Sequence, residues 1–181
     1  MKTSIKIILV CSLIFLFILT LLSMNGIYIQ LGTPSVGISH QFLNLLFIFT
    51  TVFSGVYLIN YKQKDKALKG IVAAIGLFLL IIPLLNWIMS SDAEYITFTS
   101  PDKKEKFLII ETGHGELYQL SDSKLFMIHL ADINTDDGFK PFTNKAFKLE
   151  WEEPNKLFIH YAFDYMEPDK YQKISITYKA H

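Results

Sequence analysis

The chain has 181 residues, of which 51% are hydrophobic, and its 17 basic and 17 acidic residues give a formal net charge of zero. This balance argues against a nucleic-acid-binding protein, because binding phosphates requires a concentrated basic face. The single cysteine, Cys11, excludes an intramolecular disulfide. All the basic residues are lysine, which indicates the AT-rich coding of a low-GC Gram-positive bacterium.

The first half of the chain contains three long apolar segments, at residues 7–24, 42–59 and 71–89. Each has about eighteen residues, and at roughly 1.5 Å per residue of helix this length matches the hydrocarbon core of a bilayer. None of the segments contains a carboxylate, a lysine or a histidine. We therefore expect residues 1–90 to form a transmembrane anchor of three helices, with the lipid bilayer as its first partner.

The lysines around these segments predict their orientation. Basic residues precede the first segment and separate the second from the third, whereas the loop 25–41 has none; they are Lys2, Lys6, Lys62, Lys64, Lys66 and Lys69. Positive charges favour the cytoplasmic side. We therefore expect a multi-pass protein of the cell membrane, with a cytoplasmic amino terminus and an extracellular carboxyl-terminal domain.

The second half, residues 91–181, changes to the alternation of strands. Short runs of alternating residues separated by turn residues are expected at 95–99, 106–111, 116–120, 125–130, 147–151, 157–163 and 174–178. The fold class is thus three transmembrane helices followed by a small antiparallel β-sandwich or open barrel. Trp151 shares a strand face with Phe147 and Leu149, so we expect this face to be buried.

The resemblance of the chain to known proteins rests on two motifs of this half. The turn SPDKK at 100–104 and the hairpin KLEWEEPNKLFIHY at 148–161 follow a multi-span anchor. This combination resembles small uncharacterised membrane proteins of Gram-positive bacteria that have an extracytoplasmic β domain. The resemblance implies location and architecture, and it implies no activity.

One stretch has the composition of a metal site. Asp132, Asn134 and Asp136 alternate in DINTDDG, and alternating oxygen ligands suit a hard cation such as Ca²⁺. Gly138 stands one place later than an EF-hand loop requires, and Thr143 occupies the position of the bidentate carboxylate. A solvated turn explains the same residues, because Asp, Asn and Gly favour turns.

Catalytic motifs do not emerge from the sequence. His114, His129 and His160 are not in an HExxH spacing, no serine lies in a G-x-S-x-G motif, and Cys11 lies in an apolar segment. We therefore do not expect the protein to be an enzyme or to bind a cofactor. We expect an accessory or interaction protein of the cell surface, such as a sensor, an immunity-type factor or a complex subunit. Its outer domain is expected to bind a membrane or extracellular protein. The alternative is a metal-dependent surface hydrolase that uses the outer His and Asp residues.

Overall fold

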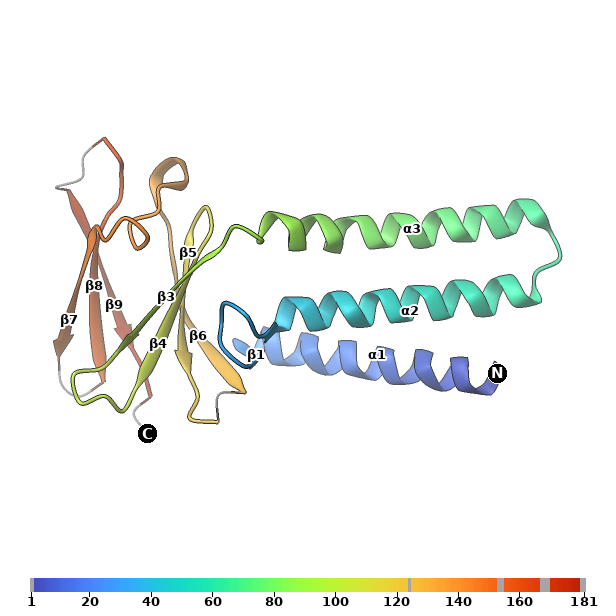
Figure 1. Ribbon diagram of the computed structural model, residues 1–181, viewed down its shortest axis with the longest axis horizontal. Helices are drawn as coiled ribbons and strands as arrows, with labels where there is room; N and C mark the ends of the chain where they lie inside the picture. Colours follow the sequence, from blue (N-terminus) through green and yellow to red (C-terminus); the bar gives the residue numbers. More distant parts are fainter. Residues whose placement is uncertain (1, 124, 153–154, 167–169, 180–181) are drawn as a thin grey trace. The chain divides into compact units, whose positions relative to one another are not determined.

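The computed structural model describes residues 2–123, 125–152, 155–166 and 170–179, and Figure 1 shows its elements in chain order. Glu153 and Pro154, which belong to the expected EEPNK turn, lie outside the described residues. The chain divides into two compact units. Residues Met1–Asn25 and Ile38–Ser91 form the helical unit, and residues Gly26–Gly37 and Asp92–His181 form the β unit.

The helical unit contains α1 (Lys2–Met24), α2 (His40–Lys62) and α3 (Lys66–Met89), together with the two-residue strand β2 (Ile38–Ser39). All three helices are long and apolar enough to cross a membrane. Two have side-chain caps: Ser39 accepts a hydrogen bond from the N–H of Phe42, and Asp65 accepts one from the N–H of Ala67. The expectation of three long apolar helices is therefore confirmed.

Helix α2 packs against both α1 and α3. The hydroxyl of Thr51 in α2 donates a hydrogen bond of 2.8 Å to Ser12 in α1. On the other side, Gly76 of α3 lies so close to α2 that an added Cβ would stand 2.7 Å from the side chain of Val56. Small and hydroxylated residues at such contacts are typical of helices that pack within a bilayer.

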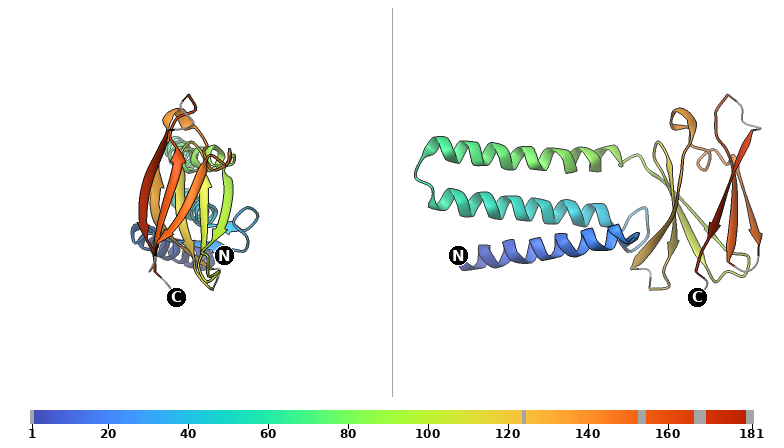
Figure 2. Two further views of the ribbon diagram at one scale, coloured as in Figure 1. Left: turned by 90° about the vertical axis from the view of Figure 1, so that its left-hand side faces the viewer. Right: turned by 180° about the vertical axis from the view of Figure 1, so that it is seen from behind.

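The β unit consists of two antiparallel sheets, which form separate layers in Figure 2. Five of its strands form one sheet in the order β1-β6-β5-β4-β3, and the other sheet has the order β7-β8-β9. The bounds of the first five are β1 (Ile27–Leu31), β3 (Glu94–Thr99), β4 (Lys106–Glu111), β5 (Gly115–Leu120) and β6 (Phe126–Ile133). Those of the second sheet are β7 (Phe147–Glu152), β8 (Lys156–Ala162) and β9 (Tyr171–Thr177).

Besides a smaller cluster of Leu108, Tyr118 and Met127, the β unit has its main apolar core between the two sheets. The buried members of this core come from both layers and from the segment that links them: Phe107, Ile109, Leu117, Ile133, Phe142, Leu157, Ile159, Tyr161 and Ile176. Trp151 is half-buried at the margin of this core, with its ring centroid 5.5 Å from that of Phe107 and 5.9 Å from that of Tyr178. The expectation of a small antiparallel β fold is therefore confirmed, and Trp151 is less buried than its strand pattern suggested.

Strand β1 is a component of the β unit that the sequence did not reveal. It comes from the connection between α1 and α2 and pairs antiparallel with β6, with Tyr28 opposite Met127. The Tyr28 ring also packs edge-on against Tyr118, at a centroid distance of 5.4 Å. The β unit thus includes Gly26–Gly37 in addition to the expected carboxyl-terminal half.

Candidate functional site

The two sheets of the β unit are closed on one side and open on the other. On the closed side β6 contacts β9. On the open side, β3 and β7 are the last strands of their sheets; Phe98 and Trp151 bridge them at one end, with ring centroids 6.4 Å apart, and a groove of about 560 Å³ lies at the other end. Its lining residues are Glu94, Ile96, Phe142, Thr143, Lys145 and Phe147.

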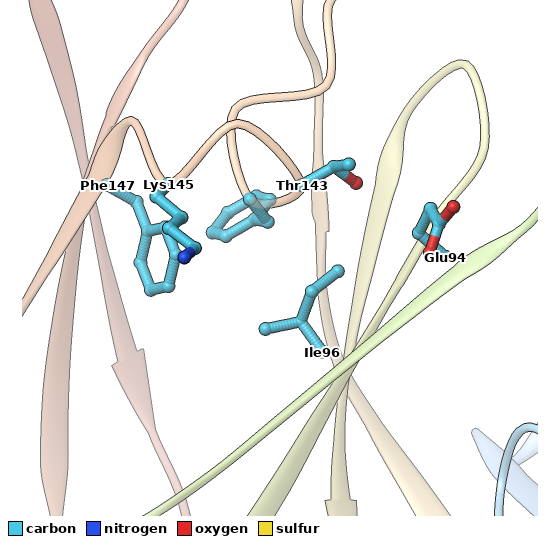
Figure 3. Close-up of a pocket in the computed structure, with 6 residues that line it drawn as sticks. Glu94, Ile96, Thr143, Lys145 and Phe147 are labelled. Atoms are coloured by element: carbon cyan, nitrogen blue, oxygen red, sulfur yellow. The ribbon is translucent and has the colours of Figure 1, made fainter.

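The floor of the groove is apolar, and its rim is charged. In Figure 3, Ile96 of β3 and Phe147 of β7 lie on facing sides of the space. Phe142, 2% exposed, packs against Phe147 with a centroid distance of 5.0 Å. Glu94 and Lys145 are both exposed, and they place one charge of each sign at the mouth. The groove can therefore receive an apolar group that has polar or charged neighbours.

The turn between Pro141 and Lys145 is held over the core by Glu111, the last residue of β4. Glu111 is 1% exposed, and its carboxylate accepts hydrogen bonds from the N–H of Phe142 at 3.0 Å and from the N–H of Thr143 at 2.7 Å. The hydroxyl of Thr143 donates a third bond at 2.6 Å. A buried carboxylate is stable only with such partners. Glu111 therefore positions Phe142 and Thr143 in the groove.

Lys145 ends this turn in the left-handed region, at φ 57°. A non-glycine residue seldom adopts this conformation unless the surrounding structure requires it. Here the N–H of Lys145 donates to the carbonyl of Phe142, and the next N–H, of Ala146, donates to the carbonyl of Pro141. The backbone thus directs the Lys145 side chain to the rim of the groove.

A polar cluster also lies on the face of the five-stranded sheet that points away from the core. Glu116 of β5 and Asp132 of β6 are directly opposite in the register, and like charges in such a position repel. Hydrogen bonds to each carboxylate offset this repulsion. Tyr118 and His114 bond to Glu116 at 2.5 Å and 3.3 Å, and His129 bonds to Asp132 at 2.9 Å.

Two tyrosines of this cluster have raised pKa values. Burial raises the pKa of Tyr118 far above its usual value, and the hydrogen bond to Glu116 raises it further. Burial also raises the pKa of Tyr28, and the charges of Glu116 and Asp132 add to the effect. Both phenols therefore stay protonated at neutral pH, and the Tyr118 hydroxyl donates its hydrogen bond to Glu116.

The residues of the expected calcium stretch fall on different elements. Asp132 lies in β6 with its side chain 63% exposed, and Asp136 begins the 3₁₀ turn η1 (Asp136–Gly138). Between them, the carbonyl of Asn134 accepts a hydrogen bond from the Tyr161 hydroxyl. Within the described ranges, the structure contains no group of three or more His, Cys, Asp or Glu side chains that could hold a metal ion.

The three histidines considered for a hydrolase each pair with one carboxylate. His114 pairs with Glu116 and His129 with Asp132, while His160 lies 3.0 Å from Glu150 on the neighbouring strand β7. The hydrogen bond from His160, together with the nearby charge of Lys173, lowers the pKa of Glu150. The pair of His160 and Glu150 therefore lies on the other sheet, apart from the polar cluster that contains His114 and His129.

Sequence reasoning did not find the groove, although one signal for it was present. Glu111 ends the apolar run KFLIIE, and a carboxylate within a strand otherwise buried on both faces must have a specific partner. That partner, the turn around Phe142, is about thirty residues away and is visible only in the fold. Comparisons of the chain with family models, with curated proteins and with solved structures find no match.

Proposed function

We propose that this chain is a membrane-anchored, non-catalytic interaction protein of the cell surface, which binds a partner protein through its β unit. The observation that carries the proposal is the groove between β3 and β7, with an apolar floor and opposite charges at its rim. Apolar floors with polar rims are typical of binding surfaces on proteins. The membrane placement is supported by the three apolar helices and by the lysines that flank them.

The order of the elements supports placing the whole β unit on one side of a membrane. The chain enters this unit after α1, leaves it before α2 and enters it again after α3. Three successive crossings put the end of α1, the start of α2 and the end of α3 on the same side. Both segments of the β unit can therefore fold together outside the cell.

The chemistry of the groove indicates an extended segment of a protein as the ligand. Ile96, Phe142 and Phe147 suit a large apolar side chain, and the rim charges of Glu94 and Lys145 favour opposite charges on its neighbours. Because the groove lies at the start of β3 and the start of β7, which are terminal strands of their sheets, the residues next to this side chain can lie beside either strand. The partner is thus expected to insert an apolar residue flanked by charged ones.

Charge reversal at the rim tests this proposal. We expect Lys145→Glu in the full-length protein to lower partner recovery at least about tenfold, because the rim then carries two anions and no cation. Recovery is measured by affinity capture from gently solubilised, crosslinked cells. Lys148→Glu is the matched control. Lys148 is also exposed and follows Phe147 in β7, on the opposite face of the strand. Equal recovery with Lys145→Glu and Lys148→Glu, or recovery of the wild-type protein alone, contradicts the proposal.

A further inference from the structure

The connection between α2 and α3 contains the most basic eight-residue stretch of the chain. Residues 62–69 read KQKDKALK, in which four lysines and one aspartate leave a net charge of 4 − 1 = +3. Only residues 63–65 separate the two helices, so these charges gather at one end of the helix pair (Figure 1). The opposite ends, around His40 and Met89, contain no lysine. The four turn lysines are Lys62, Lys64, Lys66 and Lys69.

The other polar side chains of this turn bond to its backbone. The side-chain oxygen of Gln63 accepts hydrogen bonds from the N–H of Lys64 at 2.8 Å and from the N–H of Asp65 at 3.1 Å. The carboxylate of Asp65 accepts one from the N–H of Ala67 at 2.8 Å and so caps α3. Among the described residues, no carboxylate lies within ion-pair distance of the turn lysines. The described part of the chain therefore leaves their charge without a paired anion.

The position of two turn lysines is unfavourable for the helix that they begin. Lys66 and Lys69 lie in the first turn of α3, which contains no acidic residue. The N-terminus of a helix is the positive end of its dipole, so cations there are repelled and anions are stabilised. Asp65, at the N-cap, supplies one negative charge against these two cations. An anion bound beside Lys66 and Lys69 would offset the remaining repulsion.

The apolar residues next to the turn favour a lipid over other anions. Ile59 and Tyr61 are exposed just before Lys62, and Leu77 is exposed three turns after Lys66 on the same face of α3. Lys62 and Lys66 are terminal residues of helices that are long and apolar enough to cross a membrane, so their ammonium groups can reach the headgroups. A phospholipid has the same order of parts, with a phosphate above apolar chains. A free phosphate ion complements the lysines alone.

We propose that the turn between α2 and α3 binds the phosphate headgroup of an anionic phospholipid. The four turn lysines are its cationic contacts, and the acyl chains lie along the exposed apolar residues of α2 and α3. A zwitterionic phospholipid carries its own cation beside the phosphate, and the lysines repel that cation. The turn therefore distinguishes the two lipid classes by charge. This inference rests on the proposed function only for the membrane anchor, and it involves neither the groove nor a protein partner.

Quenching of a tryptophan by brominated lipids measures this preference. In a Trp87→Phe background, Leu77→Trp places a reporter in α3 at the depth of the acyl chains, and the Trp87→Phe protein without it gives the fluorescence of Trp151 to subtract. The full-length protein is reconstituted in vesicles of equal parts phosphatidylcholine and phosphatidylglycerol, with one of the two lipids brominated in each preparation. Phosphatidylglycerol is expected to bind beside the reporter at least about fivefold more strongly than phosphatidylcholine.

Three sets of substitutions separate the charge of the turn from other effects. Changing the four turn lysines together to glutamine should lower the preference to less than about twofold, because the cationic contacts are lost. Changing the same four lysines to arginine keeps the charge and should keep the preference. The matched control changes four exposed lysines of the β unit to glutamine and should also keep the preference; they are Lys103, Lys104, Lys106 and Lys148.

The source of the phosphate is tested in the same vesicles. Inorganic phosphate, compared with chloride at equal ionic strength, should leave the preference unchanged; if phosphate abolishes it, the turn binds free phosphate and the proposal is overturned. Equal quenching by both brominated lipids, or an undiminished preference in the glutamine variant, overturns the proposal and leaves the membrane anchor intact. Absence of quenching by either lipid overturns the anchor as well. Because the vesicles contain no partner protein, these outcomes are independent of the capture experiment with Lys145→Glu.

Discussion

Phe107→Ala is expected to lower the free energy of unfolding of the β unit by about 3–5 kcal/mol, the usual cost of removing a buried aromatic side chain. Phe107 is fully buried at the centre of the core. Its ring lies 5.4 Å from that of Phe98, 5.5 Å from that of Trp151 and 5.1 Å from that of Tyr178, by ring centroids. These three aromatic rings lose their common neighbour if Phe107 is removed, and a small domain has little stability to spare.

Trp151 provides the measurement for this prediction. The chain has two tryptophans, and in a Trp87→Phe background the fluorescence of Trp151 reports only on the β unit. Urea titration of the full-length protein in detergent should show the midpoint of the Phe107→Ala variant far below that of the parent. Tyr165→Ala is the control, because Tyr165 is 75% exposed and its removal should cost less than about 1 kcal/mol. Equal midpoints for Phe107→Ala and Tyr165→Ala would contradict the described core.

Glu111→Ala is expected to lower the same free energy by about 2–4 kcal/mol and also to disturb the groove. The change removes the acceptor of three hydrogen bonds, from the N–H of Phe142 and from the N–H and hydroxyl of Thr143. A buried donor left without a partner costs about 1–3 kcal/mol. Because these donors belong to the turn that lines the groove, partner recovery should fall together with stability.

Two further variants distinguish the effect of the hydrogen bonds that Glu111 accepts from the effect of its negative charge. Glu111→Gln keeps one acceptor oxygen and should lose less stability than Glu111→Ala in the same urea titration. Glu152→Ala removes an exposed carboxylate whose ion pair with Lys156 contributes little. If Glu111→Ala is no more destabilising than Glu152→Ala, Glu111 does not hold the turn.

Elements with a strong local pattern could be predicted from the sequence. The apolar segments became α1, α2 and α3, and the hairpin expected at 147–163 became β7 and β8, with Trp151 opposite Leu157. Such elements depend on hydrophobic length or on alternation within a few residues. The alternation correctly predicted that Trp151 faces the core. Its partial exposure arises from the position of β7 at the edge of the sheet, which the strand pattern does not reveal.

Features that depend on distant pairing could not be predicted in this way. Strand β1 has only five residues, and it lies within an uncharged stretch between two apolar segments, so its pattern does not stand out. Its partner β6 follows about a hundred residues later. The groove likewise requires the order of the strands, because Ile96 and Phe147 come from different sheets. Local periodicity contains no information about which strands become neighbours.

We propose above all that Gly26–Gly37 and the carboxyl-terminal half lie together on the outside of a membrane. Single cysteines in a Cys11→Ser background test it, at Val36, which is 86% exposed, at Ser123 in the β unit, and at Lys64 between α2 and α3. In intact cells an impermeant maleimide should label Val36→Cys and Ser123→Cys to the same extent, and it should label Lys64→Cys only after permeabilisation. Labelling of Lys64→Cys in intact cells, or unequal access to Val36→Cys and Ser123→Cys, would contradict the account.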